Sequence, residues 1–257
     1  QLDLSNISIN HKIKYGLEDI YYALDFALIS EGALKSERIY DELNGLKVRL
    51  QQILNSENRR FFDEGKEIIT KNEFVERLFY GEKHYQIINF NLNNVEERFV
   101  KVLTKIYTRI FFNYVTNLKE RASFPIHVIL EEAHRYVQID SDVDVLGYNI
   151  FDRIAKEGRK YGLLLGFITQ RPCELSITCL SQCSNFITFK IFHPSDIDII
   201  SSISSNVSVE TIEKIKNLLP GTAIVFGSSF KVPLLVKLEL PNPMPKSTSV
   251  DIVNKWY

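Results

Sequence analysis

Two adjacent carboxylates follow an apolar run near the middle of the chain, and together they could hydrolyse a phosphoanhydride. The run covers residues 126–130, and the acids are Glu131 and Glu132. In nucleotide-hydrolysing α/β folds, a buried strand delivers acids to its C-terminal edge, where they hold magnesium and water. One acid can orient metal-bound water while the other activates the attacking water. The spacing leaves an alternative equally open: both acids start a helix, whose N-terminus favours carboxylates.

A second set of polar residues follows another apolar run. Residues 163–168 lead into Thr169, Gln170, Arg171 and Pro172. A polar side chain at the tip of a neighbouring strand can donate to a γ-phosphate or to its water, so Gln170 is a candidate sensor. The alternative is an ordinary turn in which Pro172 opens the next helix.

A basic segment lies between these two sets. Arg153, Lys156 and Lys160 share one helical face, and Arg159 lies between the last two. Basic residues near a helix C-terminus are favoured by its dipole, so a solvated face is the simpler interpretation. The functional alternative places Arg159 in the active site of a neighbouring subunit, where a guanidinium would stabilise transition-state charge and make hydrolysis depend on assembly.

The phosphate-binding loop that ATP hydrolysis requires is absent from this sequence. No G-x-x-x-x-G-K-[ST] pattern occurs. At the nearest approach, around Gly65 and Lys66, Arg60 replaces the first glycine and Glu67 replaces the hydroxyl residue. The phosphate cradle of such an enzyme is therefore missing from the residues given.

The composition is that of an ordinary soluble protein. The chain has 257 residues, 45% of them hydrophobic, which is enough for one large domain or a domain with a helical appendage. A formal net charge of -1 gives no general basic footprint for nucleic acid. Three cysteines argue against a disulfide framework and favour the cytoplasm. No apolar run approaches the roughly 20 residues that span a bilayer.

Hydrophobic periodicity divides the chain near residue 82. Residues 1–82 have helical spacing and predict a small helical bundle. Residues 83–240 alternate apolar runs with amphipathic helices, which predicts an α/β fold with a largely parallel sheet. Residues 241–257 predict an extended tail. The helices are expected near 95–110, 149–160 and 208–219, and the strands at 84–91, 126–130, 163–168, 186–192, 222–226 and 232–238.

The combination of motifs is more specific than any one of them. It comprises E-E-A-H-R at 131–135, R-I-A-K-E-G-R-K-Y-G at 153–162, I-T-Q-R-P-C-E-L-S at 168–176 and L-S-Q-C-S-N-F-I at 180–187. This combination resembles the C-terminal half of the HerA/FtsK superfamily, specifically its HerA branch, over about residues 84–240. The resemblance implies a RecA-like ASCE P-loop NTPase core, and residues 46–61 resemble the family's helical insertion.

The resemblance also implies cofactors and site residues. An ATPase of this type uses ATP and Mg²⁺. Matching positions make Glu131 and Glu132 the acidic pair, with Glu131 holding Mg²⁺ directly or through water, and make Gln170 the sensor and Arg159 the trans-acting finger. Arg153 and Arg171 are weaker candidates for the finger, and Arg171 is also a candidate nucleotide contact beside Glu131 and Gln170.

The implied assembly is a homohexameric ring that threads double-stranded DNA and hydrolyses ATP between subunits. Its effector would be a NurA-type nuclease or, in antiphage defence, a sirtuin-type NAD-consuming enzyme. Two alternatives stay open: a nucleotide-binding scaffold that assembles an effector without translocation, and a conjugation or secretion motor from a sister branch. A zinc site at Cys173, Cys179, Cys183 and His193 is disfavoured because the close cysteine pair is missing.

Overall fold

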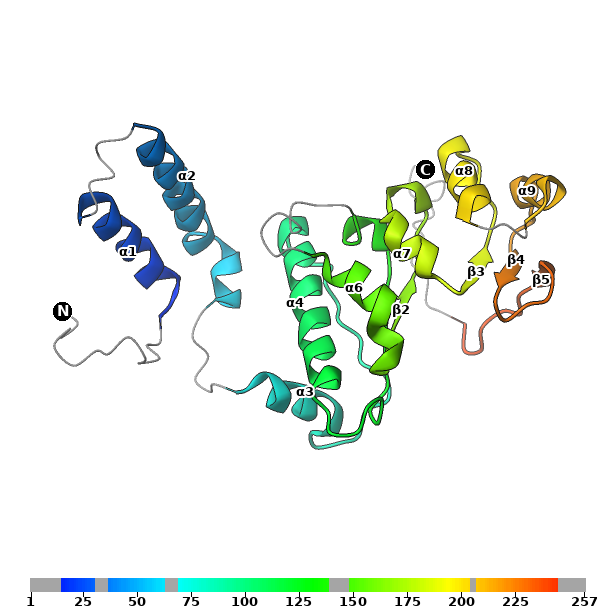
Figure 1. Ribbon diagram of the computed structural model, residues 1–257, viewed down its shortest axis with the longest axis horizontal. Helices are drawn as coiled ribbons and strands as arrows, with labels where there is room; N and C mark the ends of the chain where they lie inside the picture. The colour runs from blue at the N-terminus through cyan, green and yellow to red at the C-terminus, as the bar shows by residue number, and fades with distance from the viewer. Residues whose placement is uncertain (1–14, 31–36, 63–68, 139–147, 204–206, 245–257) are drawn as a thin grey trace, which may run out of the picture. The chain divides into compact units, whose positions relative to one another are not determined.

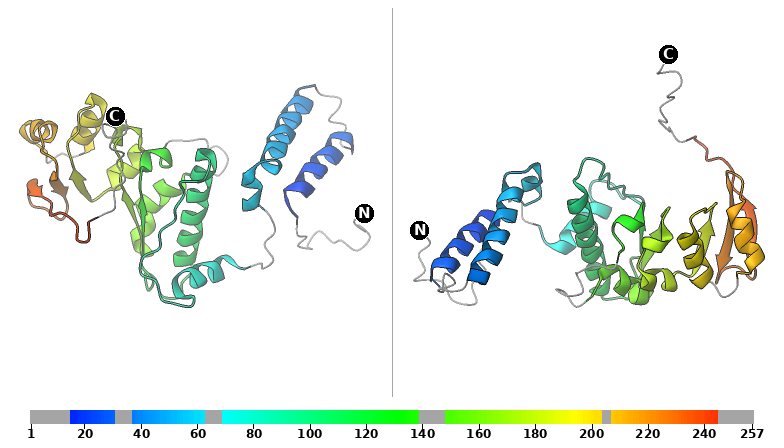
Figure 2. Two further views of the ribbon diagram at one scale, coloured as in Figure 1. Left: turned by 180° about the vertical axis from the view of Figure 1, so that it is seen from behind. Right: turned by 90° about the horizontal axis from the view of Figure 1, so that it is seen from above.

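The computed structural model describes residues 15–30, 37–62, 69–138, 148–203 and 207–244 (Figures 1 and 2). The chain divides into two units, Gln1–Val100 and Lys101–Tyr257. The expected tail lies largely outside the described residues, as do Gly65, Lys66 and Glu67. None of the described helices is both long and apolar enough to cross a membrane.

The described residues of the first unit are largely helical up to Tyr80. Its helices are α1 (Leu17–Ser30), α2 (Glu37–Leu54), the short η3 (Glu57–Phe61) and α3 (Lys71–Tyr80). Helices α1 and α2 lie side by side (Figure 1). The Nζ of Lys47 in α2 lies 4.9 Å from the ring centroid of Tyr21 in α1. Arg59 of η3 adds an ion pair of 2.7 Å with Glu18 of α1.

The strand expected at residues 84–91 does not form, and this prediction was wrong. The segment has no regular secondary structure, and Ile87 is 88% exposed. A strand requires a partner for its backbone groups, and none of the described residues pairs with this segment in a ladder. The apolar pattern of a segment does not show whether another strand is available to pair with it.

The second unit contains the strands and the remaining helices. Helix α4 (Glu97–Thr116) leads into it, and its Phe112 contacts Tyr161 edge-on and lies under the guanidinium of Arg153. The elements that follow are β1 (Ile126–Leu130), η4 (Ala133–Arg135), α6 (Ile150–Glu157), η5 (Gly158–Lys160), β2 (Leu163–Phe167), η6 (Pro172–Glu174), α7 (Ile177–Gln182), β3 (Asn185–Thr188), α8 (Pro194–Ile203), α9 (Val209–Lys216), β4 (Thr222–Gly227) and β5 (Leu234–Lys237).

Local sequence signals explain where several of these elements begin and end. The side chain of Asn149 accepts the amide of Phe151 and caps α6, and Ser208 caps α9 in the same way. The predicted helix at 149–160 tightens into η5 over its last turn and stops at Gly162, whose φ of 85° favours glycine.

The sheet is only partly parallel, which corrects the expectation of one largely parallel sheet. Strands β1 and β2 form a parallel pair, whereas β3, β4 and β5 form a separate antiparallel sheet in that order. The difference arises because β3 pairs with β4 rather than with β2. Behind the antiparallel sheet, α8 and α9 bury a core of Ile200, Ile215, Leu218, Ile224 and Phe226. The fold is therefore mixed α/β.

Candidate functional site

The parallel register of β1 and β2 brings their C-terminal ends together. Leu130 at the end of β1 lies opposite Phe167 at the end of β2. The pairing continues past both strands, because the amide of Ile168 donates to the oxygen of Leu130 and the amide of Ala133 donates to the oxygen of Ile168, both at 2.9 Å. Side chains that follow the two strands are consequently neighbours.

Two side chains approach the carboxylate of Glu132. The Nε2 of Gln170 donates to its Oε1 over 3.0 Å, and the Nδ1 of His134 lies 3.5 Å from its Oε2. The backbone of Glu132 is left-handed, with a φ of 48°. The left-handed conformation costs a residue with a Cβ about 1–2 kcal/mol, and strained conformations are concentrated at functional sites.

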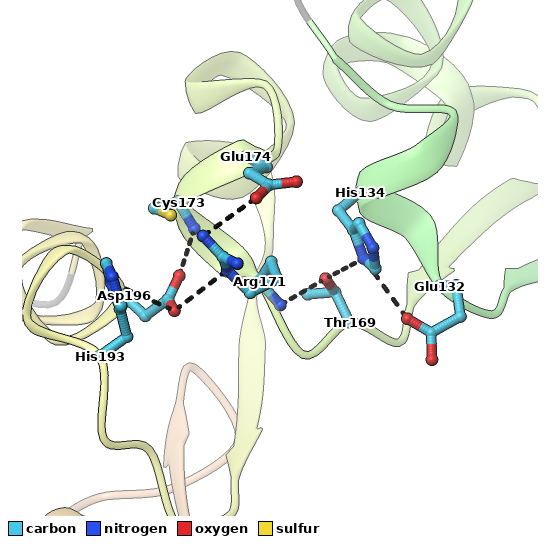
Figure 3. Close-up of polar contacts among 8 residues, drawn as sticks. All are labelled: Glu132, His134, Thr169, Arg171, Cys173, Glu174, His193 and Asp196. Carbon is cyan, nitrogen blue, oxygen red and sulfur yellow. Dashed lines mark hydrogen bonds and ion pairs between the residues drawn. The ribbon is translucent and has the colours of Figure 1, made fainter.

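A chain of polar contacts continues from Glu132 along the loop after β2 (Figure 3). The Nδ1 of His134 is also 3.1 Å from the Oγ1 of Thr169, and that hydroxyl oxygen accepts the amide of Arg171 over 3.0 Å. These contacts tie the segment after β1 to the segment after β2 through side chains as well as through the backbone.

The guanidinium of Arg171 is turned towards a second acidic group rather than towards Glu132 (Figure 3). Its Nη2 lies 3.1 Å from Glu174, and its Nε lies 3.7 Å from Asp196. Asp196 is buried at the start of α8 and accepts the amide of Cys173 over 3.0 Å. The arrangement anchors the loop after β2 to α8.

Glu131 is exposed at the end of β1, so its carboxylate is accessible to solvent. The described residues contain no group of three histidine, cysteine, aspartate or glutamate side chains that could hold a metal ion. Magnesium usually keeps several waters and is held by one or two carboxylates together with substrate phosphates. A single exposed carboxylate such as that of Glu131 is compatible with that pattern.

Arg159 does not meet these residues within one chain. It is exposed in η5, which precedes the N-terminal end of β2, whereas Glu132 and Gln170 lie beyond the C-terminal ends of the strands. The five residues of β2 alone separate the two edges by about 16 Å. Arg153, the weaker candidate, is bonded to Glu157 in its own helix. A role for Arg159 at Glu132 therefore needs a second copy of the chain.

The three cysteines are free thiols, and they serve packing or local hydrogen bonding. Cys179 is buried, and its Sγ lies 3.1 Å from Asp152, which also accepts the hydroxyl of Ser176. Burial, followed by the contact with Asp152, raises the pKa of the Cys179 thiol. A neutral buried thiol is a poor nucleophile and a poor metal ligand.

Sequence reasoning missed three members of this arrangement. His134 was considered only as a member of the E-E-A-H-R motif, Thr169 only as a residue after the second apolar run, and Asp196 was not singled out. The sequence signal for His134 and Thr169 was a histidine two residues after an acid at the end of one strand, together with a hydroxyl residue at the end of the next strand. No local pattern points to Asp196, which comes 25 residues after Arg171 and reaches the loop only through the fold.

The chain is similar to known helicases over most of its length. It is 29% identical to the DNA double-strand break repair helicase HerA of Pyrococcus furiosus, over 92% of this chain and 45% of the relative. It is 34% identical to a probable helicase of Methanocaldococcus jannaschii, over 70% of this chain and 35% of that protein. The chain thus spans less than half the length of these relatives. No family model matches it.

One solved structure supports the fold. VirB4 of Thermoanaerobacter pseudethanolicus matches 88% of this chain and 56% of its own with a TM-score of 0.57 at 14% identity, a likeness that shows the fold alone. The resemblance to HerA-type proteins is confirmed: this chain has HerA-like helicases as homologues, at about 29% identity over most of its length.

Proposed function

We propose that this chain belongs to an ATP-hydrolysing DNA translocase or helicase motor of HerA type. The observation that carries the proposal is the 3.0 Å contact between Glu132 and Gln170, which come from the ends of two adjacent parallel strands. An acid and an amide in this relation can orient a water and sense the phosphate that the water attacks. The HerA relatives supply the DNA-acting part of the proposal.

Each residue has a proposed role in hydrolysis. Glu132 accepts the proton of the attacking water, while Gln170 donates to the γ-phosphate or to that water. Glu131 holds Mg²⁺, directly or through water, and the ion would neutralise charge on the phosphate oxygens. To contact the nucleotide, Arg171 would have to break its ion pairs with Glu174 and Asp196. It is therefore a weaker candidate for a nucleotide contact than Gln170.

Arg159 acts from a neighbouring subunit in this proposal. Its exposure, and its place at the opposite edge of the strand pair from Glu132, support a role between chains. A guanidinium inserted from a neighbour would make turnover depend on assembly, and we propose a homohexameric ring around duplex DNA. The proposed effector is a nuclease or an NAD-consuming enzyme. The motor and its effector would act in the cytoplasm, either in DNA end processing or in antiphage defence.

ATP turnover by the full-length protein, with and without duplex DNA, tests the proposal. Glu132→Gln should abolish turnover while ATP binding persists, whereas Glu210→Gln, an exposed glutamate of α9, should leave turnover unchanged. Arg159→Ala should abolish turnover in assembled rings, whereas Lys160→Ala, its exposed neighbour, should not. A wild-type protein that assembles and binds ATP without hydrolysing it would favour the scaffold alternative instead.

A further inference from the structure

We propose that His134 is a positioning residue that fixes the direction of the Glu132 carboxylate by donating its Nδ1–H to it and to Thr169. The inference rests on the proposed function, since it assigns Glu132 the part of the base. The inference gives His134 a role beside Glu132. It also explains the contact between His134 and Thr169 in the loop after β2.

The backbone places His134 where it can act on Glu132. The left-handed conformation of Glu132 reverses the chain directly after β1, and η4 follows at once. As a result the imidazole two residues later faces the carboxylate of Glu132, with its Nδ1 3.5 Å from Oε2 (Figure 3). The His134 side chain is 19% exposed, whereas that of Glu132 is 43% exposed and remains accessible to water.

The contacts of Nδ1 identify the tautomer. Nδ1 faces two oxygens, the Oε2 of Glu132 and the Oγ1 of Thr169 at 3.1 Å. If the Thr169 hydroxyl donated to Nδ1, the lone pair of Nδ1 would face a carboxylate, which is repulsive. A protonated Nδ1 instead donates to both oxygens, and the Oγ1 of Thr169 can accept from it and from the amide of Arg171 at once.

The result is a carboxylate that is held at both oxygens. Gln170 donates to Oε1 and His134 donates to Oε2, so Glu132 cannot rotate freely about its last bond. Each carboxylate oxygen keeps a further lone pair for the proton of a water molecule. The contacts of His134 are with Glu132 and Thr169, which are not among the residues proposed to bind the nucleotide, so its loss should slow the chemical step without weakening ATP binding.

Steady-state turnover of the full-length protein tests this division. His134→Ala should lower kcat about 10- to 100-fold, as loss of an outer-shell partner does, with KM for ATP unchanged within about twofold. His134→Asn keeps an amide donor at the position of Nδ1 and should restore most of kcat. The control is His84→Ala, at an exposed histidine that packs on Tyr80, and this change should leave kcat unchanged. Equal losses in the Ala and Asn variants, or a raised KM at unchanged kcat, would overturn the proposal.

A spectroscopic measurement tests the same contact without turnover. Solid-state ¹⁵N spectra of the full-length protein labelled at histidine can be assigned by the signal that His134→Asn removes. We expect that signal to report a protonated Nδ1. An unprotonated Nδ1 would refute the inference, whether or not the protein hydrolyses ATP. A wild type with a protonated Nδ1 but no turnover would instead contradict the proposed function alone.

Discussion

The Glu132→Gly variant should have a higher free energy of unfolding than the Glu132→Ala variant, although neither should hydrolyse ATP. Its φ of 48° lies in the left-handed region, which costs a residue with a Cβ about 1–2 kcal/mol and costs glycine almost nothing. Both variants lose the same contacts with Gln170 and His134, so those losses cancel in the comparison. What remains is the backbone term.

The expected difference follows from two opposing contributions. Glycine removes the left-handed cost of about 1–2 kcal/mol but loses more backbone entropy on folding, worth about 0.5–1 kcal/mol. At the midpoints of these two ranges, Glu132→Gly should exceed Glu132→Ala by about 0.75 kcal/mol in free energy of unfolding. At a slope of about 2 kcal/mol per molar urea, the midpoint would rise by roughly 0.4 M.

Urea unfolding of the full-length variants measures this difference, and Glu131 provides the control. Among the described residues other than glycine, positive φ occurs only at Ala122 and Glu132, so Glu131 has an ordinary backbone. There the sign should reverse, with Glu131→Gly less stable than Glu131→Ala by about 0.5–1 kcal/mol. If glycine destabilises both positions alike, the left-handed turn that presents Glu132 and His134 is not formed.

Three further predictions concern the surroundings of the site. Gly158→Ala should lower the free energy of unfolding by about 1–3 kcal/mol, because its Cβ would come 2.5 Å from the backbone oxygen of Leu163; an unchanged urea midpoint would contradict this close approach. Asp196→Ala should cost about 1–3 kcal/mol, because the amide of Cys173 loses its acceptor; a cost equal to that of an exposed aspartate would show that the loop is not anchored there. Cys179 should resist alkylation at pH 8 until the protein unfolds, because its pKa is raised and it is buried. Alkylated Cys179 in mass spectra of the native protein would contradict this prediction.

Local signals predicted the elements that position the site. The strands at 126–130 and 163–168 were identified from continuous apolar runs that end at polar residues, and the structure gives β1 and β2 within one residue of those limits. The helix starts at Asn149 and Ser208 were predictable because each side chain caps its own helix. All of these signals lie within a few residues of the element that they define.

Strand pairing was less predictable because it depends on distant residues. The apolar content of residues 84–91 satisfied a strand pattern, yet a strand forms only where another backbone pairs with it. Similarly, β3 was expected in a parallel sheet, but it pairs with β4, which follows it by more than 30 residues. No local pattern distinguishes these partners.

The contact between Glu132 and Gln170 could be predicted from the sequence, whereas the contacts of His134 and Asp196 could not. Glu132 and Gln170 are 38 residues apart, but the rule that parallel strand ends meet predicted that they would lie together. The contact of His134 with Glu132 depends on a left-handed glutamate, a conformation for which glutamate has no preference. Asp196 reaches the loop only because α8 packs against η6.

A double-mutant cycle on kcat tests most directly whether Glu132 and Gln170 form one hydrolytic site. Gln170→Ala alone should lower kcat of the full-length protein about 10²- to 10³-fold, as loss of a transition-state donor does. In the Glu132→Gln background the same change should have little further effect, because residues that act as a unit are not additive. If the two losses multiply, or if Gln170→Ala leaves kcat unchanged, the two residues do not act together and the account of the site is wrong.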